Sequence, residues 1–498
     1  MKQFSKFFIF LLLLCHFTFL AHAKGQAVVS ANKEATRAGL NVLHDGGTAA
    51  DAAVAMAFML GVAEPHGSGI GGGGFFLYYE KTRNRFWFLD YREAAPAAAK
   101  NEDYAPTASV AMGRLSETGA KAVAVPGFVA GMDAIHKHFG KRAWADLLTP
   151  AIDLAKTGFV PSDFLKRKYA GEKDRLSAQA GMDSFFGKAM ASKDGILKME
   201  NLAATMGKIQ RGGAEEFYRG ALSRVILEEL KAAGSVIGAE DLRSYHVFSR
   251  KPYEFLFNGY RILSAPLPST GGIFLEEALR GAQAAGVKSG TPEFTEWFAK
   301  ELVSYFEKRN GLADTEVGIL GDTTHLCVID AEGNIAAMTN TINSAFGSGV
   351  VLPGTGILLN NEMDDFVFDP KKNSANHINY RNRPLSSMSP TIIFKGANPV
   401  LVIGTPGGLT IPLNIYQILQ RYLVEGEGLR SAMAAPKFYS FPHQEKAFFE
   451  QGYKGLSQSL TLKPTLAEKP VGNGQAIFID GDKLDSVSDP RGEGVGGN

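Results

Sequence analysis

Helix-forming patterns dominate the first half of this sequence and strand-forming patterns the second, and no linker separates the two halves. Alanine and other apolar residues recur at helical spacing from Glu34 to Leu60, with a turn at residues 45–47. Residues 127–230 also carry helical patterns, whereas strand signals begin near Tyr260 and dominate from Thr323 onward. Because there is no tandem repeat, heptad run or low-complexity stretch, we expect one interwoven α/β body.

Two hairpins are predicted. Residues 75–79 and 86–89 are aromatic and apolar, and a polar turn lies between them. From Thr323, THLCVID, the turn AEGN and IAAMTNTIN repeat the order of strand, turn and strand. The glycine-rich residues 492–498 are expected to fray.

The first 23 residues are typical of a signal peptide. They combine Lys2 and Lys6, an apolar run over residues 7–14 and an Ala21-His22-Ala23 ending. An uncleaved membrane anchor is the alternative, although this apolar stretch is short for a membrane span. We therefore expect an exported protein, secreted or periplasmic, without stable membrane insertion.

Charge and cysteine content narrow the possible functions. Without residues 1–23 the count of Lys and Arg falls from 52 to 50 against 51 Asp and Glu, a net charge of −1. No basic patch indicates nucleic-acid binding. Only Cys327 then remains, so no intramolecular disulfide is possible. Cys327 lies in an apolar strand without a positive neighbour, which favours a small buried hydrophobe over a nucleophile.

Common cofactor and metal motifs are absent or out of context. The glycines of HGSGIGGGGFF, from His66, match a dinucleotide fingerprint in spacing, but a helical pattern precedes them and a strand pattern follows. A turn with positive φ or close packing is the preferred interpretation. There is no Walker loop, GxSxG elbow or HExxH, and the histidines lack ligand spacing, so we expect no cofactor and no metal.

Residues 322–408 contain several side chains of the kinds that occur in catalytic sites. Thr341 and Asn343 stand two apart on a predicted strand, so both can face one site. Acids, hydroxyls and a glycine pair follow, each of which alone is also typical of a solvated or ordinary turn: Glu362, Asp364, Asp365, Ser386, Ser387, Gly407 and Gly408.

Blocks of sequence spread over most of the chain resemble the γ-glutamyltransferases. They include GGTAADAAVAMAFMLGVAEPHGSGIGGGGFFLYY from Gly46, LDYREAAP from Leu89, TTHLCVIDAEGN from Thr323, GILLNNEMDDF from Gly356, RPLSSMSP from Arg383 and TPGG from Thr405. The resemblance implies a four-layer αββα sandwich of the N-terminal-nucleophile hydrolase type. It also implies self-cleavage between Asp322 and Thr323 into a large subunit, 24–322, and a small subunit, 323–498, that form one domain.

The same resemblance assigns the catalytic groups. Thr323 would be the nucleophile, because the amine freed by cleavage can serve as the base for its own hydroxyl. Thr341 would hydrogen-bond that hydroxyl, and the N–H groups of Gly407 and Gly408 would form the oxyanion hole. The reaction implied is cleavage of γ-glutamyl amides such as glutathione, with transfer of the acyl group to water or an amine acceptor.

Donor recognition is also implied by the family positions. Arg92, Ser386 and Ser387 match residues that hold the α-carboxylate, and Asn343, Glu362 and Asp365 match those that hold the α-ammonium. The stretch between Asp365 and Arg383 is short compared with relatives that carry a lid, so Tyr380 is considered as a substitute. Residues 290–322 match poorly. A poly-γ-glutamate-processing or acylase relative and a binding relative that never processes are the alternatives.

Overall fold

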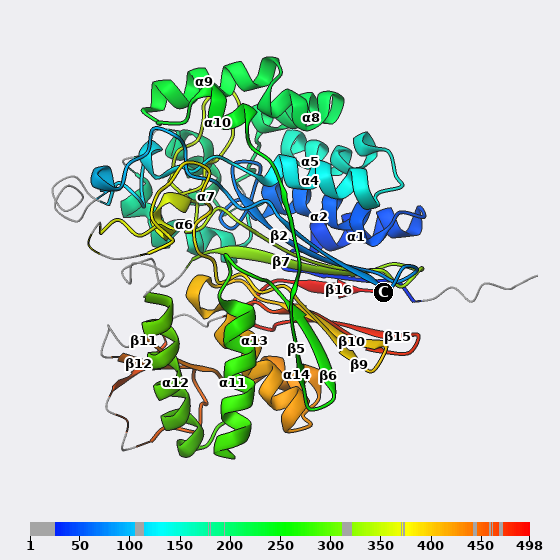
Figure 1. The fold of residues 1–498 in the computed structure, drawn as a ribbon. Helices are drawn as coiled ribbons and strands as arrows, with labels where there is room; N and C mark the ends of the chain where they lie inside the picture. The colour runs from blue at the N-terminus through cyan, green and yellow to red at the C-terminus, as the bar shows by residue number, and fades with distance from the viewer. Residues whose placement is uncertain are drawn as a thin grey trace, which may run out of the picture.

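Two β-sheets lie face to face between two layers of helices in the computed structural model (Figure 1). This is the predicted αββα sandwich. The structure describes residues 25–104, 114–177, 179, 181–193, 195–310, 321–369, 371, 374–441, 446–457, 460, 462–467 and 472–498. The predicted signal peptide lies outside these residues.

The first sheet interleaves the two halves of the sequence, as expected for one interwoven body. Its order is β16 (Val495–Gly497), β1 (Ala27–Ser30), β7 (Thr323–Ile329), β8 (Ile335–Thr341), β2 (Gly73–Glu80), β3 (Arg85–Asp90) and β4 (Phe248–Arg250). Both predicted hairpins are confirmed, as β2–β3 and β7–β8.

The second sheet has the order β15 (Lys483–Ser488), β14 (Gln475–Asp480), β10 (Asn398–Gly404), β9 (Thr391–Lys395), β6 (Tyr260–Ser264) and β5 (Tyr253–Phe257). A small third sheet contains β11 (Phe438–Phe441), β12 (Lys446–Phe449) and β13 (Lys463–Leu466).

Burial on both faces explains why the central strands are continuously apolar. On β2, Phe76 and Tyr78 pack in the core beneath the first helix layer, while Phe75 and Leu77 pack in the core between the sheets. Cys327 lies in the second core, fully buried as expected, and burial raises the pKa of its thiol well above the ordinary value.

One helix layer covers the first sheet. It contains α1 (Lys33–His44), α2 (Ala49–Ala63), α4 (Phe128–Phe139), α5 (Trp144–Thr157), α6 (Asp163–Leu176), α7 (Lys188–Ala191), α8 (Glu200–Tyr218), α9 (Ala221–Ala233) and α10 (Ala239–Arg243). The helices and the turn predicted over residues 34–60 are confirmed. The alanine-rich α2 is almost entirely buried, and a capping box between Thr48 and Asp51 starts it.

The αββα sandwich implies the other helix layer, but its individual helices were not predicted. It contains α11 (Gly271–Ala285), α12 (Pro292–Asn310), α13 (Ile411–Leu419) and α14 (Leu429–Ala434), all within the half that strand signals dominate. On α11 the buried residues include Phe274, Leu275, Ala278, Leu279 and Ala282, which is helical spacing toward the second sheet.

The expected fraying of the chain end is wrong. Residues 495–497 form β16, which pairs with β1 in antiparallel register. The free hydrogen-bonding edge of β1 gives this glycine-rich segment a partner, which its composition does not reveal.

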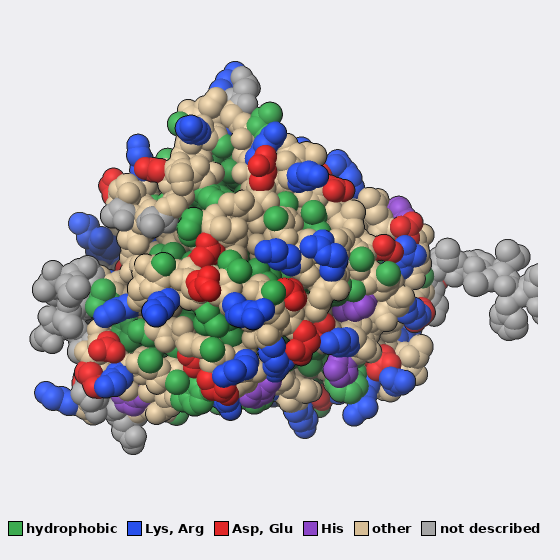
Figure 2. All heavy atoms as spheres, turned by 90° about the horizontal axis from the view of Figure 1, so that it is seen from above, with side chains coloured by type: hydrophobic (Ala, Val, Ile, Leu, Met, Phe, Trp, Pro, Cys, Tyr) green, Lys and Arg blue, Asp and Glu red, His purple; other side chains and the backbone are tan. Residues whose placement is uncertain are grey.

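On the outer face of the first helix layer, Lys and Arg side chains are interspersed with Asp and Glu (Figure 2). Within the described ranges, no helix combines the length and hydropathy needed to cross a bilayer.

Candidate active site

Thr323 begins β7 and lies opposite Thr341, the last residue of β8, in the antiparallel register. Gly73 of β2 pairs with Thr341 on the other side. Both threonines are buried and line one pocket. The sheet register therefore brings the predicted nucleophile and its predicted hydroxyl partner together.

Two hydrogen bonds hold Asp322, the residue before Thr323, and a third orients the Thr341 hydroxyl that makes one of them. The Thr341 hydroxyl donates to the Asp322 carbonyl oxygen at 3.0 Å, and the Asn343 N–H donates to the Thr341 hydroxyl at 2.8 Å. The Asp322 N–H donates to the Asn343 carbonyl at 2.6 Å. A hydroxyl donor thus already polarises the carbonyl that must be attacked if the chain cuts itself here.

Glycines allow this close arrangement. A Cβ on Gly72 would lie 2.1 Å from the Thr341 carbonyl oxygen, and one on Gly67 would lie 3.4 Å from the carbonyl carbon of Thr323. None of the glycines of the HGSGIGGGG run has a positive φ. Of the two reasons proposed for this run, close packing is the one that the structure supports.

A charged cluster holds the side chain of Asp322 on the α6 side of the bond. The Lys168 ammonium lies 2.7 Å from the Asp322 carboxylate. Burial opposes both charges, but their mutual attraction outweighs it, so the pKa of Lys168 is raised and that of Asp322 is lowered. Both groups are therefore ionised near neutral pH.

Two further titratable groups, Glu64 and His66, lie close to this ion pair. Burial, with a smaller contribution from the Asp322 charge, raises the pKa of Glu64 to about 7, although the Thr324 hydroxyl donates to Glu64 at 3.1 Å. Burial lowers the pKa of His66 to about 4, so His66 is neutral at physiological pH.

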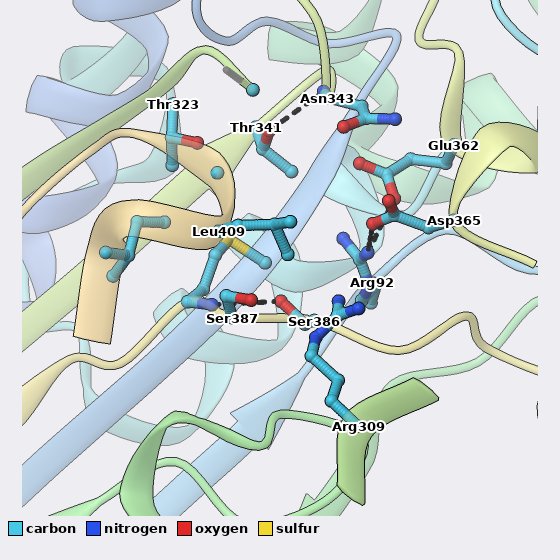
Figure 3. A pocket seen from close by; sticks show the side chains of 14 residues that line it. Arg92, Arg309, Thr323, Thr341, Asn343, Glu362, Asp365, Ser386, Ser387 and Leu409 are labelled. Carbon is cyan, nitrogen blue, oxygen red and sulfur yellow. Dashed lines mark hydrogen bonds and ion pairs between the residues drawn. The ribbon is translucent and has the colours of Figure 1, made fainter. Parts of the chain in front are cut away.

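The pocket beside Thr323 contains about 360 Å³ of space between protein atoms, part of which is open to solvent. Figure 3 shows Thr323, Thr341, Asn343, Glu362, Asp365 and Arg92 around it, with Ser386, Ser387 and Arg309 below. Its remaining lining residues are Gly321, Met388, Gly408, Leu409 and Ile411.

Arg92 is buried among carboxylates. Its guanidinium lies 2.7 Å from Glu362, forms a shorter ion pair with Asp365, and lies 3.9 Å from Glu93. Burial alone would lower the pKa of Arg92, but these carboxylates raise it. Burial raises the pKa of Glu93 to about 8 and that of Glu362 well above its usual range. This end of the pocket therefore combines one buried cation with several buried or partly buried carboxyl groups.

The loop with Gly407 and Gly408 lies against the segment that precedes Thr323. The φ angles of Gly407 and Gly408 are 129° and 55°, which favour glycine. A Cβ on Gly321 would lie 3.0 Å from the Gly408 Cα. Gly321 therefore lies against the predicted oxyanion loop.

The structure brings the predicted site residues together, with Gly407 adjoining the lining residue Gly408. Asp364 points elsewhere, accepting a hydrogen bond from Ser116 at 2.5 Å and pairing with Arg114. Tyr380 lines a different pocket, so the structure does not support it as a lid substitute. Sequence reasoning missed Lys168, Glu93 and Arg309. Among the described residues, no group of His, Cys, Asp and Glu is arranged to hold a metal ion.

Comparisons with known proteins show similarity over nearly the whole chain. The sequence model of the Gamma-glutamyltranspeptidase family matches residues 35–319 and 315–497. A glutathione hydrolase proenzyme of Pseudomonas aeruginosa is 34% identical, over 96% of this chain and 95% of its own. A protein of the same name from Escherichia coli is 31% identical, over 94% and 91% of the two chains.

Two solved structures are also similar to this chain. A cephalosporin acylase from Bacillus halodurans superposes with a TM-score of 0.81 at 25% identity, over 95% of this chain and 96% of its own. The γ-glutamyltranspeptidase of Helicobacter pylori matches with a TM-score of 0.53 at 32% identity, over 57% of this chain and 83% of its own. Sequence, fold and site together establish that the chain belongs to the gamma-glutamyltranspeptidase family.

Proposed function

We propose that this chain is the precursor of a γ-glutamyltransferase and glutathione hydrolase that cuts itself between Asp322 and Thr323. The observation that carries the proposal is the Asp322 carbonyl, bound by the Thr341 hydroxyl next to Thr323 at the edge of a charged pocket. Relatives from Pseudomonas aeruginosa and Escherichia coli that match over nearly their full length are named glutathione hydrolase proenzymes, which supports it.

Cleavage would begin with the Thr323 hydroxyl attacking the Asp322 carbonyl carbon. The Thr341 hydroxyl, already 3.0 Å from that carbonyl oxygen, would stabilise the negative charge that develops on it. The C–N bond then breaks, which leaves an ester on the Thr323 oxygen and frees the Thr323 amine. Hydrolysis of that ester releases the Asp322 carboxylate and restores the Thr323 hydroxyl. An unperturbed α-amine has a pKa of about 7.7 to 8.0, so near neutrality it can accept the proton of the adjacent hydroxyl.

The two fragments, 24–322 and 323–498, would remain together after the cut. β7 of the small fragment pairs with β1 of the large fragment, and β8 pairs with β2. These long antiparallel pairings lie between two apolar cores, so separating the fragments would expose both cores to water.

Catalysis would use the Thr323 hydroxyl as nucleophile and the N–H groups of Gly407 and Gly408 as oxyanion donors. Cleavage lets Gly321 leave the oxyanion loop, so the donor carbonyl can take its place. The donor's α-ammonium would lie near Asn343, Glu362 and Asp365. Its α-carboxylate would lie toward Arg92, Ser386 and Ser387, and the acyl group would pass to water or to an amine acceptor.

The functional test compares two donors that differ only in the α-ammonium. We expect kcat/KM for a γ-glutamyl anilide to exceed that for a glutaryl anilide by about 100-fold, because charge-assisted hydrogen bonds contribute about 1.5 to 3 kcal/mol each. Glu362→Gln should reduce this preference, whereas Asp364→Asn, in the same turn but outside the pocket, should retain it. Preference for the glutaryl compound would instead favour an acylase, the function named for the structural relative from Bacillus halodurans.

Lys168→Met is expected to slow self-cleavage by about 10-fold, because it leaves the Asp322 carboxylate without its ion-pair partner beside the bond. The cut fraction is followed on denaturing gels during renaturation. Lys173→Met, an exposed change on the same helix, serves as the control. Asp322→Asn in the Lys168→Met background should restore part of the rate; an unchanged rate in Lys168→Met would contradict a role for this ion pair.

Export is part of the proposal and depends on residues 1–23. After removal of this segment the enzyme would act in the periplasm or the medium, on small γ-glutamyl compounds and amine acceptors.

A further inference from the structure

The nitrogen of the bond between residues 322 and 323 faces a group of charged side chains on the α6 side. The Thr323 N–H donates a hydrogen bond to the Asp322 carboxylate, and the same carboxylate lies 2.7 Å from the Lys168 ammonium. One carboxylate therefore joins the Lys168 ammonium to the nitrogen that cleavage would free. The segment after α2 also packs here, because a Cβ on Gly67 would lie 3.6 Å from the Thr323 nitrogen.

Glu64, the residue directly after α2, is a second carboxyl group in this cluster. Its side chain is buried, and it accepts a hydrogen bond from the Thr324 hydroxyl at 3.1 Å. The contact holds the Glu64 carboxyl beside the residue that follows Thr323. In the uncut chain burial, helped by the Asp322 charge, raises the pKa of Glu64 to about 7, against the opposing effect of Lys168.

Cleavage would change the charges around this nitrogen. The segment that ends at Asp322 has to leave the oxyanion loop before a donor carbonyl can enter. The Asp322 charge then no longer raises the pKa of Glu64, whereas Lys168 remains and the Thr323 ammonium is added. Both positive charges favour the ionised carboxyl group. Glu64 thereby replaces Asp322 as the buried anion near Lys168 and the new amine.

We propose that Glu64 and Lys168 are positioning residues that set the proton affinity of the Thr323 α-amine in the processed enzyme. Glu64 favours the ammonium form and Lys168 favours the neutral amine, so together they leave the amine near its unperturbed pKa of about 7.7 to 8.0. This inference rests on the proposed function, in which the neutral amine accepts the hydroxyl proton of its own residue. Turnover therefore rises as the pH passes through the pKa of the amine.

The other charged groups around this amine come from several elements. His66 is neutral in the working range, because burial lowers its pKa to about 4. Glu493, in the C-terminal segment, is exposed, so water and salt screen its charge. Glu172 is on α6 and pairs with an arginine of the same helix at 2.9 Å. The charged residues on the pocket side are Arg92, Arg309, Glu362 and Asp365. A single substitution in the cluster leaves these other charges in place.

The test is the pH dependence of kcat/KM for a γ-glutamyl anilide, measured on cut enzyme. Glu64→Gln keeps an acceptor for Thr324 but removes the negative charge, so the midpoint of the acid limb should move to lower pH by about 0.5 to 1 pH unit. Lys168→Met removes the positive charge, so the midpoint should move to higher pH by a similar amount. The double variant should return close to the unmodified enzyme. Because Lys168→Met is expected to cut slowly, its cut fraction is collected after prolonged incubation.

Two matched controls remove the same charges at exposed positions. Glu493→Gln removes a carboxylate near the cluster and Lys173→Met removes an ammonium on α6, and each should move the midpoint by less than about 0.2 pH unit. A second measurement does not depend on turnover: the rate at which acetic anhydride acylates the Thr323 amine, read from the mass of the N-terminal peptide of the small fragment. Its midpoint should shift with the same signs, because only the neutral amine reacts.

Shifts of opposite sign in the two single variants would support the inference, because a loss of packing does not reverse its effect with the charge removed. Shifts in the same direction, or an unchanged midpoint in either variant, would overturn it. Failure of the proposed function would look different: the unmodified chain would then have no free amine at residue 323 or would not turn over the anilide.

Discussion

Thr323→Ala is expected to leave the chain uncut and to lower turnover of a γ-glutamyl anilide by about 10⁴-fold or more. The substitution removes the hydroxyl that would attack the Asp322 carbonyl, to which the Thr341 hydroxyl donates, so the peptide bond between residues 322 and 323 stays intact. Without cleavage there is no free amine at residue 323, and Gly321 stays against the Gly408 loop. One change therefore removes the nucleophile, its base and access to the oxyanion hole.

Denaturing gels and initial rates measure both effects on the same preparation. Thr323→Ser keeps a hydroxyl and should still cut and turn over substrate, although more slowly. The buried neighbour Thr324, which donates to Glu64, provides a matched control: Thr324→Ser should process normally. An alanine variant that is cut and active would show that another residue carries the chemistry.

Gly407→Ala is expected to lower kcat by about 10² to 10³-fold while KM changes little. Gly407 has φ of 129°, which an L side chain rarely adopts, and a Cβ there would lie 2.5 Å from the Thr410 hydroxyl oxygen. That hydroxyl donates to the Gly407 carbonyl at 2.8 Å, so the loop must shift as a unit. The shift misplaces the N–H donors that stabilise the tetrahedral intermediate.

The measurement is steady-state kinetics normalised to the amount of cut enzyme. Gly396→Ala is the control, because Gly396 also has positive φ, at 62°, but a Cβ there meets no atom within 4 Å. Gly396→Ala therefore measures the general effect of placing alanine at a positive φ, at a position outside the pocket. A Gly407→Ala enzyme with unchanged kcat would place the oxyanion hole elsewhere.

The sequence predicted the features that depend on local pattern and strand register. The order of strand, turn and strand from Thr323 predicts a hairpin, and in the structure the register of that hairpin puts Thr323 opposite Thr341. The family resemblance supplied Arg92, Glu362 and Asp365, and their positions agree with one pocket.

The missed residues depend on long-range packing. Lys168 lies 154 positions before its partner Asp322, and nothing in either local sequence indicates the contact. Arg309 follows Lys308 near the end of a helix that was not predicted, where a basic pair is usually an exposed favourable contact with the helix dipole. Only the docking of α12 on the second sheet turns Arg309 inward. The role of the glycines after His66 was also not predictable from local sequence, because their close approach to Thr341 depends on tertiary packing.

The most direct test of the account is the mass of the small fragment, trapped by acid during turnover of a γ-glutamyl anilide. The account predicts a fragment that begins at Thr323 and carries one added γ-glutamyl group on that residue, together with an unmodified large fragment that ends at Asp322. A fragment that begins at another residue, or an acyl group on any other side chain, would contradict it.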